Sequence, residues 1–295
     1  MAPSQLTQFS HMFNLTRGVL PLLAGIALLY GCAETNLPPI TDSPTNTYRT
    51  GEIVWRDLVT KDASASAKFY SDVFGWKVSK SEGAVPDYYT ITNRGELIGG
   101  ILQFPEKSRV DGNEWLSTMS ARDIAGASAS ITANGGQVMT EAQDVPGRGE
   151  YIIAVDPSGG ILALLDADGG DPAQSKSAEN DWLWSELWSN DPESVQSFYG
   201  AFGYTFKKET DDDRDYWIMK AGDSNVGGVM QNPVDNTRSM WLPYIHVADV
   251  SVMSDRVTRF GGRVISGPSD DIRNGTLALC VDPLGGFFAI QEWSN

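Results

Sequence analysis

Trp55-Arg-Asp-Leu-Val-Thr-Lys-Asp62, followed by Phe69-Tyr70 and Phe74-Gly75-Trp76, is the stretch that decides the fold, because the chain contains it twice. The second copy is Trp184-Ser-Glu-Leu-Trp-Ser-Asn-Asp191, followed by Phe198-Tyr199 and Phe202-Gly203-Tyr204. Later motifs return in the same order: Asp87-Tyr88-Tyr89 as Asp215-Tyr216-Trp217, Gly135-Gly136 as Gly261-Gly262, and Asp156-Pro-Ser-Gly-Gly160 as Asp282-Pro-Leu-Gly-Gly286. A repeat this long predicts two copies of one domain.

The composition agrees with two globular domains. The 295 residues suit about two domains of common size, and 41% hydrophobic with 20% charged residues is a globular balance. The formal net charge of −16 argues against a nucleic-acid partner, because phosphate binding needs Lys and Arg surfaces. It favours solubility and, more weakly, a cationic ligand.

The first 32 residues have the pattern of a bacterial lipoprotein signal peptide. Residues 18–30 form an apolar run after Arg17 that is too short to span a bilayer comfortably. The run ends in Leu29-Tyr-Gly-Cys32, which resembles a lipobox, although Tyr30 is bulkier than usual there. We therefore expect lipid on Cys32 and a membrane anchor on the periplasmic side of the cell envelope. Ala33 after the cysteine favours the outer membrane, and a plain membrane anchor is the alternative.

The remaining segments follow from this assignment. Residues 33–50 are rich in Thr, Pro and Asn, which predicts a flexible tether. Residues 51–168 and 181–295 form the two domains, joined by a linker at 169–180. With lipid on Cys32, only Cys280 remains, so no internal disulfide is expected. Its apolar surroundings predict a buried, inert thiol.

Each copy in turn contains two similar halves. In the first half, the pattern of residues 52–60 predicts a strand, and Asp62 is a typical helix N-cap. The apolar spacing after Asp62 predicts a helix that ends at Gly75. Three short strands follow, and the whole series is repeated from Trp115 to 165. The second domain repeats it from 183 to 230 and from 241 to 292. The sequence therefore predicts an α+β fold with four β-α-β-β-β modules, two per domain.

These modules and motifs resemble the vicinal oxygen chelate (VOC) superfamily, which includes glyoxalase I, extradiol dioxygenases and the bleomycin resistance proteins. The resemblance is carried by Trp55, Asp62, Phe69-Tyr70, Phe74-Gly75-Trp76, Gly135-Gly136, Asp156-Pro-Ser-Gly-Gly160 and their second copies. It implies two tandem VOC domains, each a cupped mixed sheet. It leaves open whether the two domains pair within one chain or across a homodimer.

The resemblance also implies a metal site inside the cup, and the sequence lacks its ligands. The family's ligand positions fall on Trp55, Gly99-Gly100, Ser117 and Ala163, and in the second domain on Trp184, Gly227-Gly228, Pro243 and Ala289. The chain has two histidines, and His11 lies in the signal peptide. We therefore expect no metal and no other cofactor. His246 is expected to point away from the cup and to serve no catalytic role.

The residues expected to face the two cups are aromatic and acidic. Strand alternation puts Trp55 and Asp57 on one face, and Trp184, Glu186 and Trp188 on the equivalent face. Tyr89 and Trp217, from the repeated Tyr88-Tyr89 and Tyr216-Trp217 pairs, are expected to extend that wall. Such a wall suits a flat or cationic organic ligand. The alternative is that these aromatic side chains pack the cup shut.

Three functions remain open at this point. The sequence favours a lipid-anchored protein that binds a small organic molecule without a metal, as the bleomycin resistance branch does. The second is a glyoxalase-like lyase or related VOC enzyme that uses Asp57 or Glu186 as a base, or an atypical metal site. The third is a scaffold whose filled cups serve only protein contacts.

Overall fold

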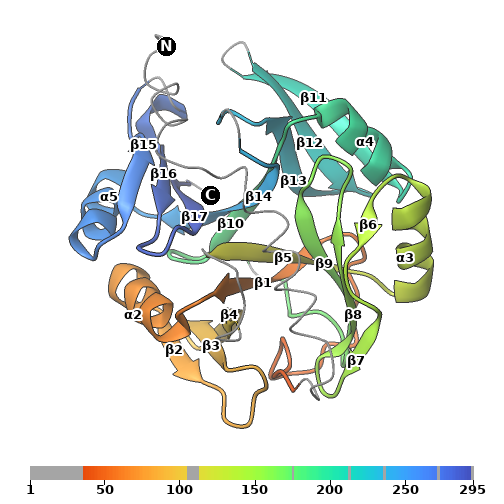
Figure 1. Cartoon of the computed structure of the whole chain (residues 1–295). Coiled ribbons are helices and arrows are strands. Elements are labelled where there is room, and N and C mark those ends of the chain that lie inside the picture. Colours follow the sequence, from red (N-terminus) through yellow and green to blue (C-terminus); the bar gives the residue numbers. More distant parts are fainter. Residues whose placement is uncertain are drawn as a thin grey trace.

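The computed structural model describes residues 36–104, 113–174, 176–211, 214–234, 237–270 and 273–293, folded as two β-sheets with helices between them (Figure 1). The expected signal peptide, including Cys32 and His11, lies outside these residues. Across the described ranges, no helix combines the length and apolar character needed to cross a membrane.

The first domain forms one mixed sheet in the order β2-β3-β4-β1-β5-β9-β8-β6, with β7 paired to β8. Strands β1 and β4 are parallel, as are β5 and β9, and β1 meets β5 antiparallel at the join between the two modules. Its elements are β1 (Ile53–Thr60), α2 (Ala63–Phe74), β2 (Lys77–Lys80), β3 (Tyr88–Asn93), β4 (Glu96–Gln103), β5 (Glu114–Ser120), α3 (Ile124–Ala133), β6 (Gln137–Val138), β7 (Gln143–Val145), β8 (Gly149–Val155) and β9 (Ile161–Ala167).

The second domain repeats this sheet in the order β11-β12-β13-β10-β14-β17-β16-β15, with the same parallel and antiparallel joins. The predicted four β-α-β-β-β modules and the α+β fold are therefore confirmed. Its elements are β10 (Trp182–Ser189), α4 (Pro192–Gly200), β11 (Tyr204–Asp211), β12 (Arg214–Ala221), β13 (Ser224–Gln231), β14 (Met240–Val247), α5 (Val250–Arg259), β15 (Arg263–Ser266), a 3-10 turn at Arg273–Gly275, β16 (Leu277–Val281) and β17 (Phe287–Glu292).

The four α-helices of the described residues begin in the same way. An aspartate precedes each one, and its Oδ1 accepts a hydrogen bond from the backbone N–H three residues later, at 2.8–3.0 Å. The bond satisfies one of the N–H groups that a helix start leaves without a partner. The four caps are Asp62, Asp123, Asp191 and Asp249.

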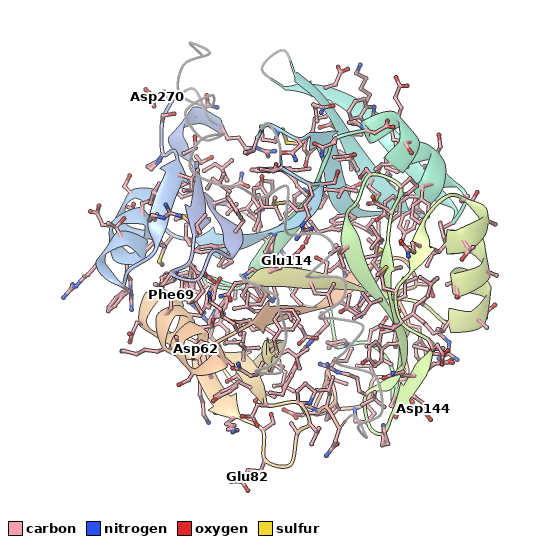
Figure 2. The ribbon with its side chains drawn as sticks, in the orientation of Figure 1. Asp62, Phe69, Glu82, Glu114, Asp144 and Asp270 are labelled. Carbon is pink, nitrogen blue, oxygen red and sulfur yellow. The ribbon has the colours of Figure 1, made fainter. Side chains whose placement is uncertain are left out.

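The helix-bearing faces of the two sheets pack against each other, so the domains pair within one chain. Helix α2 lies beside α5, and α3 lies on the same side as α4 (Figure 1). Figure 2 shows Phe69 on α2, facing the second domain, where its ring contacts Phe288. Buried hydrogen bonds cross between the domains, among them those from Tyr70 to Asp282 at 3.1 Å and from Tyr199 to Asp156 at 3.4 Å.

The interface also explains the repeated Asp-Pro-x-Gly-Gly turns. In each turn the aspartate Oδ1 accepts backbone N–H groups of its own turn, while Oδ2 accepts the tyrosine of the other domain. Burial raises the pKa of both Asp156 and Asp282 above the usual carboxyl range. Cys280 is fully buried in the same layer, and burial raises the pKa of its thiol to about 12. This supports the prediction of an inert thiol.

Residues 36–50, here called the N-terminal strap, do not form the flexible tether predicted for 33–50. Leu37 and Ile40 are 3% and 1% exposed and pack in the first cup. Asn36 exchanges two backbone hydrogen bonds with Val85, and Asp171 in the linker holds the other end of the strap through Thr47 and Arg49. Composition suggested a tether because the strap has few large apolar side chains, but these two suffice to dock it.

Candidate functional site

The first strands of the two domains, β1 and β10, lie in the middle of their sheets and supply the centre of each cup. Side chains alternate along a strand, so Trp55 and Asp57 share the concave face of the first sheet. Trp184, Glu186 and Trp188 share the equivalent face of the second. Sequence alternation predicted both sets.

Asp57 is held by hydrogen-bond donors from three directions. Its Oδ1 accepts the Trp55 indole N–H at 3.0 Å and the Tyr88 hydroxyl at 2.5 Å. Its Oδ2 lies 3.4 Å from the Arg148 guanidinium, which also donates to the Tyr88 oxygen at 2.9 Å. The Asp57 residue is 8% exposed, so these contacts replace the water that the carboxylate has lost.

Glu186 has four donors and is 1% exposed. Its Oε1 accepts the Tyr216 hydroxyl and the Arg273 guanidinium, both at 3.0 Å. Its Oε2 accepts the Trp188 indole N–H at 3.2 Å and the Tyr244 hydroxyl. Trp184 in turn donates its indole N–H to the Tyr216 oxygen at 2.9 Å. The carboxylate is thus fully hydrogen-bonded inside the cup.

The two clusters are copies of one design, with an arginine, a tyrosine and an indole around a carboxylate. Tyr88 and Tyr216 occupy equivalent positions of the repeat, on β3 and β12. Each needs a glycine on the neighbouring strand. A Cβ at Gly100 would lie 1.7 Å from the Tyr88 oxygen, and one at Gly228 would lie 2.0 Å from the Tyr216 oxygen. The glycines at the family's fourth-strand ligand position therefore make room for a tyrosine hydroxyl.

The tyrosines act as donors in these clusters. Burial raises the pKa of Tyr88, Tyr216 and Tyr244 well above the ordinary phenol value, and the neighbouring carboxylate raises it further. The three hydroxyls therefore keep their protons at neutral pH. Because each carboxylate also pairs with an arginine, the net charge of each cluster is close to zero. This differs from the acidic cup predicted from sequence.

The donor set does not fit the divalent metal that the family resemblance implies. A metal needs three or four nitrogen or oxygen ligands with lone pairs directed at it. The cups instead present N–H and O–H donors that already surround the carboxylate oxygens. Within the described ranges, no three His, Cys, Asp or Glu side chains come close enough together to hold a metal ion.

Several orientations differ from those expected from sequence. Tyr89 packs with the helix-side cluster around Tyr70, and Trp217 packs with the cluster around Tyr199, so neither faces a cup. Their neighbours Tyr88 and Tyr216 do. Because side chains alternate along a strand, only one residue of each pair can face the cup, and the sequence analysis predicted the wrong one of the two.

The same phase error affected β5 and β14. Leu116 and Thr118 line the first cup in place of Ser117, and Leu242 and Tyr244 line the second in place of Pro243. His246 therefore lies on the cup side of β14, where it was expected to point away. Its ring nitrogens Nδ1 and Nε2 lie 3.1 Å from the backbone carbonyl oxygens of Ser177 and Trp293, respectively. Both nitrogens are therefore engaged by the backbone, and neither is placed to act as a catalytic base.

The two cups differ in how they are filled. Leu37 and Ile40 of the strap fill the first, leaving a cavity of about 30 Å³ beside Asp57 and Arg148. The wall of the second cup stays partly exposed, and its partly exposed side chains are Leu183, Trp184, Met230, Val234, Met240, Leu277, Leu279 and Phe287. Among the described residues, the second cup therefore has more partly exposed apolar side chains than the first.

Sequence reasoning named the carboxylates and the indoles but missed Tyr88, Tyr216, Tyr244, Arg148 and Arg273. The repeat itself contained a signal for two of them, because tyrosine occupies the same position in Asp87-Tyr88-Tyr89 and Asp215-Tyr216-Trp217. The arginines reach the carboxylates from 91 and 87 residues away, from the loops just before β8 and β16, and they are offset by one position in the repeat.

The sequence was compared with protein families and with known proteins, and several of them are similar to it. Residues 52–164 match the model of the Glyoxalase/Bleomycin resistance protein/Dioxygenase superfamily. The putative glyoxylase CFP32 of Mycobacterium tuberculosis is 31% identical over 253 residues, covering 83% of this chain and 96% of that protein. The anthracycline biosynthesis protein DnrV of Streptomyces peucetius is 26% identical over 262 residues, covering 82% and 93%.

Solved structures share the fold at low identity. The Mn(II)-bound glyoxalase from Novosphingobium aromaticivorans superposes with a TM-score of 0.58 at 16% identity and covers 83% of both chains. An extradiol ring-cleaving dioxygenase from B. fuscum gives 0.59 at 14% identity, covering 86% of this chain and 75% of its own.

Proposed function

Because the chain belongs to the glyoxalase/bleomycin resistance protein/dioxygenase superfamily, we propose that its second domain binds a small, flat organic molecule in the cup around Glu186. The observation that carries this proposal is a buried carboxylate, saturated by four donors, at the base of a cup whose aromatic wall is partly exposed. Apolar walls with a few fixed polar groups are typical of small-molecule sites.

The cluster's charge indicates the ligand class. Arg273 neutralises Glu186, so a cation gains little there, and an uncharged aromatic molecule is favoured over the cationic one considered from sequence. Trp184, whose side chain is partly exposed, offers a ring face for stacking. The relative DnrV is named for anthracycline biosynthesis. Anthracyclines contain a flat aromatic ring system, which makes an anthracycline aglycone a suitable first probe.

An enzyme is the second candidate, favoured by the name of the mycobacterial relative, a putative glyoxylase. In that case Glu186 would act as a base, and it would first have to lose the hydrogen bonds that occupy both its oxygens. The accessible wall of the second cup counts against the third candidate, a scaffold with both cups closed.

The test is ligand binding to the full chain, measured by calorimetry with a panel of flat aromatic compounds that includes the aglycone. We expect Glu186→Gln to weaken binding by about tenfold or more. The matched change in the filled cup, Asp57→Asn, should leave the affinity unchanged. Equal losses in both variants, or no binding across the panel, would contradict the proposal. Turnover of a 2-oxoaldehyde with a thiol that Glu186→Gln abolishes would favour the enzyme.

Metal content gives an independent check, because the proposal is a metal-free site. The full chain is expressed with Ni, Zn, Mn and Fe supplied, dialysed and measured by mass spectrometry. Near-stoichiometric metal that survives dialysis would overturn the metal-free site and favour the enzyme.

We also propose that the protein is a lipoprotein of the bacterial envelope, anchored through Cys32 on the periplasmic side, in the outer membrane. The docked strap gives this proposal a geometric consequence. Four residue steps separate Cys32 from Asn36, which span at most about 14 Å. The first cup would therefore lie close to the membrane surface. Incorporation of a labelled fatty acid that Cys32→Ser abolishes would support the anchor, and unchanged labelling would contradict it. A homodimer remains a prediction, checked by light scattering.

A further inference from the structure

The interface between the domains consists of two equivalent halves, because each domain contributes one helix of each module. On one half, α2 of the first domain meets α5 of the second. Three side chains of the second domain close it. Phe288 packs edge-on against Phe69 and Tyr70, Met253 joins the same cluster, and Arg256 donates to the Asp72 carbonyl at 2.9 Å.

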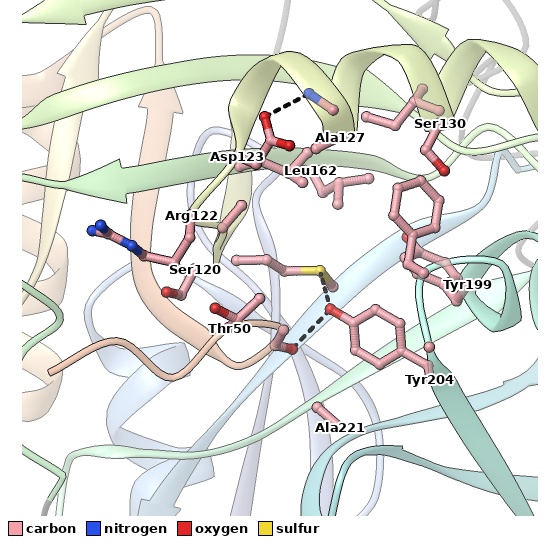
Figure 3. Close-up of a pocket in the computed structure, with 18 of the residues that line it drawn as sticks. Thr50, Ser120, Arg122, Asp123, Ala127, Ser130, Leu162, Tyr199, Tyr204 and Ala221 are labelled. Atoms are coloured by element: carbon pink, nitrogen blue, oxygen red, sulfur yellow. Dashed lines mark hydrogen bonds between the residues drawn. The ribbon is translucent and has the colours of Figure 1, made fainter.

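The other half pairs α3 with α4, and smaller side chains occupy the same three positions. Counting from the shared Asp N-caps and Asp-Pro-x-Gly-Gly turns, Met253 corresponds to Ala127, Arg256 to Ser130 and Phe288 to Leu162. All three smaller residues line a cavity of about 630 Å³ between the domains. Figure 3 shows Ala127, Ser130 and Leu162 on one side of it and Tyr199 and Tyr204 on the other.

The cavity is mostly apolar, with a polar side toward the start of the first domain. Met119, Leu164, Phe198 and Phe202 complete the apolar wall. Ser120 also borders the cavity, but it is 2% exposed and its hydroxyl oxygen is buried rather than open to the cavity.

The ionic groups at the cavity are already engaged. The Arg122 side chain points away from the cavity in Figure 3, pairs with Asp166 at 2.8 Å and lies over the Tyr48 ring. Asp123 caps the backbone N–H of Gly126, and the Tyr204 hydroxyl donates to the Gly51 carbonyl at 2.9 Å. Arg122 is the cationic group at the cavity, and because it already pairs with Asp166 an anionic ligand would find no free counter-ion there.

We propose that this cavity is a second ligand site, separate from the cups, for an uncharged and mainly apolar small molecule. Its volume falls within the range of about 300–1,000 Å³ that small-molecule pockets occupy. The ligand's apolar body lies between Ala127, Leu162 and Phe198. The site exists because the interface halves are unequal, and it does not depend on ligand binding at Glu186.

The test uses the uncharged fluorescent probe N-phenyl-1-naphthylamine with the full chain. We expect saturable binding with increased fluorescence. The double variant Ala127→Met/Leu162→Phe copies the side chains of the closed half and should weaken binding by about tenfold or more. Ala129→Met is the matched control, because Ala129 lies on the exposed face of the same helix. It should bind like the wild type. Glu186→Gln should retain the binding that the double variant loses, because Glu186 lies in the second cup.

Three outcomes would overturn the proposal: no saturable binding to the wild type, unchanged affinity in the double variant, or a loss in Glu186→Gln alone, which would put the probe in the second cup. If the double variant does not fold, as judged by circular dichroism, the single change Ala127→Met decides the matter by the same criterion.

Discussion

Glu186→Gln is the change that most directly probes the cluster in the second cup. A glutamine amide has one oxygen and one NH2 group, so it can face only one side of the cluster with an acceptor. If its oxygen faces Tyr216 and Arg273, the NH2 faces the Trp188 indole N–H, which can only donate. One donor then loses its acceptor, and Arg273 loses its charge partner.

The size of the effect follows from burial. Losing a hydrogen bond to a charged group costs roughly 1.5–3 kcal/mol, and breaking a fully buried ion pair costs about 3–5 kcal/mol. The Arg273 side chain is 31% exposed, so water compensates part of the second loss. We therefore expect the free energy of unfolding to fall by roughly 2–4 kcal/mol.

The assay is urea denaturation of the full chain, followed by tryptophan fluorescence and circular dichroism. Glu209→Gln, at an exposed glutamate, serves as the control and should stay within about 0.5 kcal/mol of the wild type. Asp57→Asn should cause a comparable loss, because Asp57 has the equivalent donors. A Glu186→Gln variant as stable as the Glu209→Gln control would refute the view that four donors hold this carboxylate.

Three further predictions follow from the packing and the pKa shifts. The double variant Leu37→Ala/Ile40→Ala should lower the free energy of unfolding by at least about 2 kcal/mol. It should also open the first cup, so that calorimetry detects binding of an aromatic compound there. Unchanged stability would mean that the strap is not docked. Phe69→Ala should cost about 3–5 kcal/mol in urea denaturation, and Phe198→Ala clearly less, because Phe198 borders a cavity; equal losses would contradict the unequal interface. Burial raises the pKa of Asp181 in the folded protein. Its contribution to stability is therefore full below the unfolded pKa of about 3.9 and is lost as the pH rises through the higher folded pKa. The stability of Asp181→Asn relative to the wild type should increase from about pH 4 to pH 7, and a difference that does not change with pH would contradict the shift.

The sequence alone determined the modular fold. The repeat, the aspartate caps and the Asp-Pro-x-Gly-Gly turns are local signals, each formed by residues within a few positions of one another. They set the order of helices and strands whatever the rest of the chain does. The carboxylates and indoles of β1 and β10 were also predictable, because alternation along one strand puts them on one face.

The phase of the other strands was decided only by the sheet. Tyr88 faces the cup and Tyr89 does not, although both fit a strand equally well. The β3–β4 pairing shifts register after Ile91, and the equivalent pairing shifts after Met219. Such irregularities depend on both strands together, so a single strand's pattern does not fix which residue faces inward.

Tertiary structure alone decided what surrounds the carboxylates and which spaces stay open. Arg148 and Arg273 reach Asp57 and Glu186 from distant loops, the strap closes one cup, and Ala127 and Leu162 leave a cavity where Met253 and Phe288 close the equivalent one. Local hydrogen bonds and alternation act between near neighbours in sequence, and so can be read from it. Burial and volume are sums over residues far apart in the chain, which only the folded structure brings together.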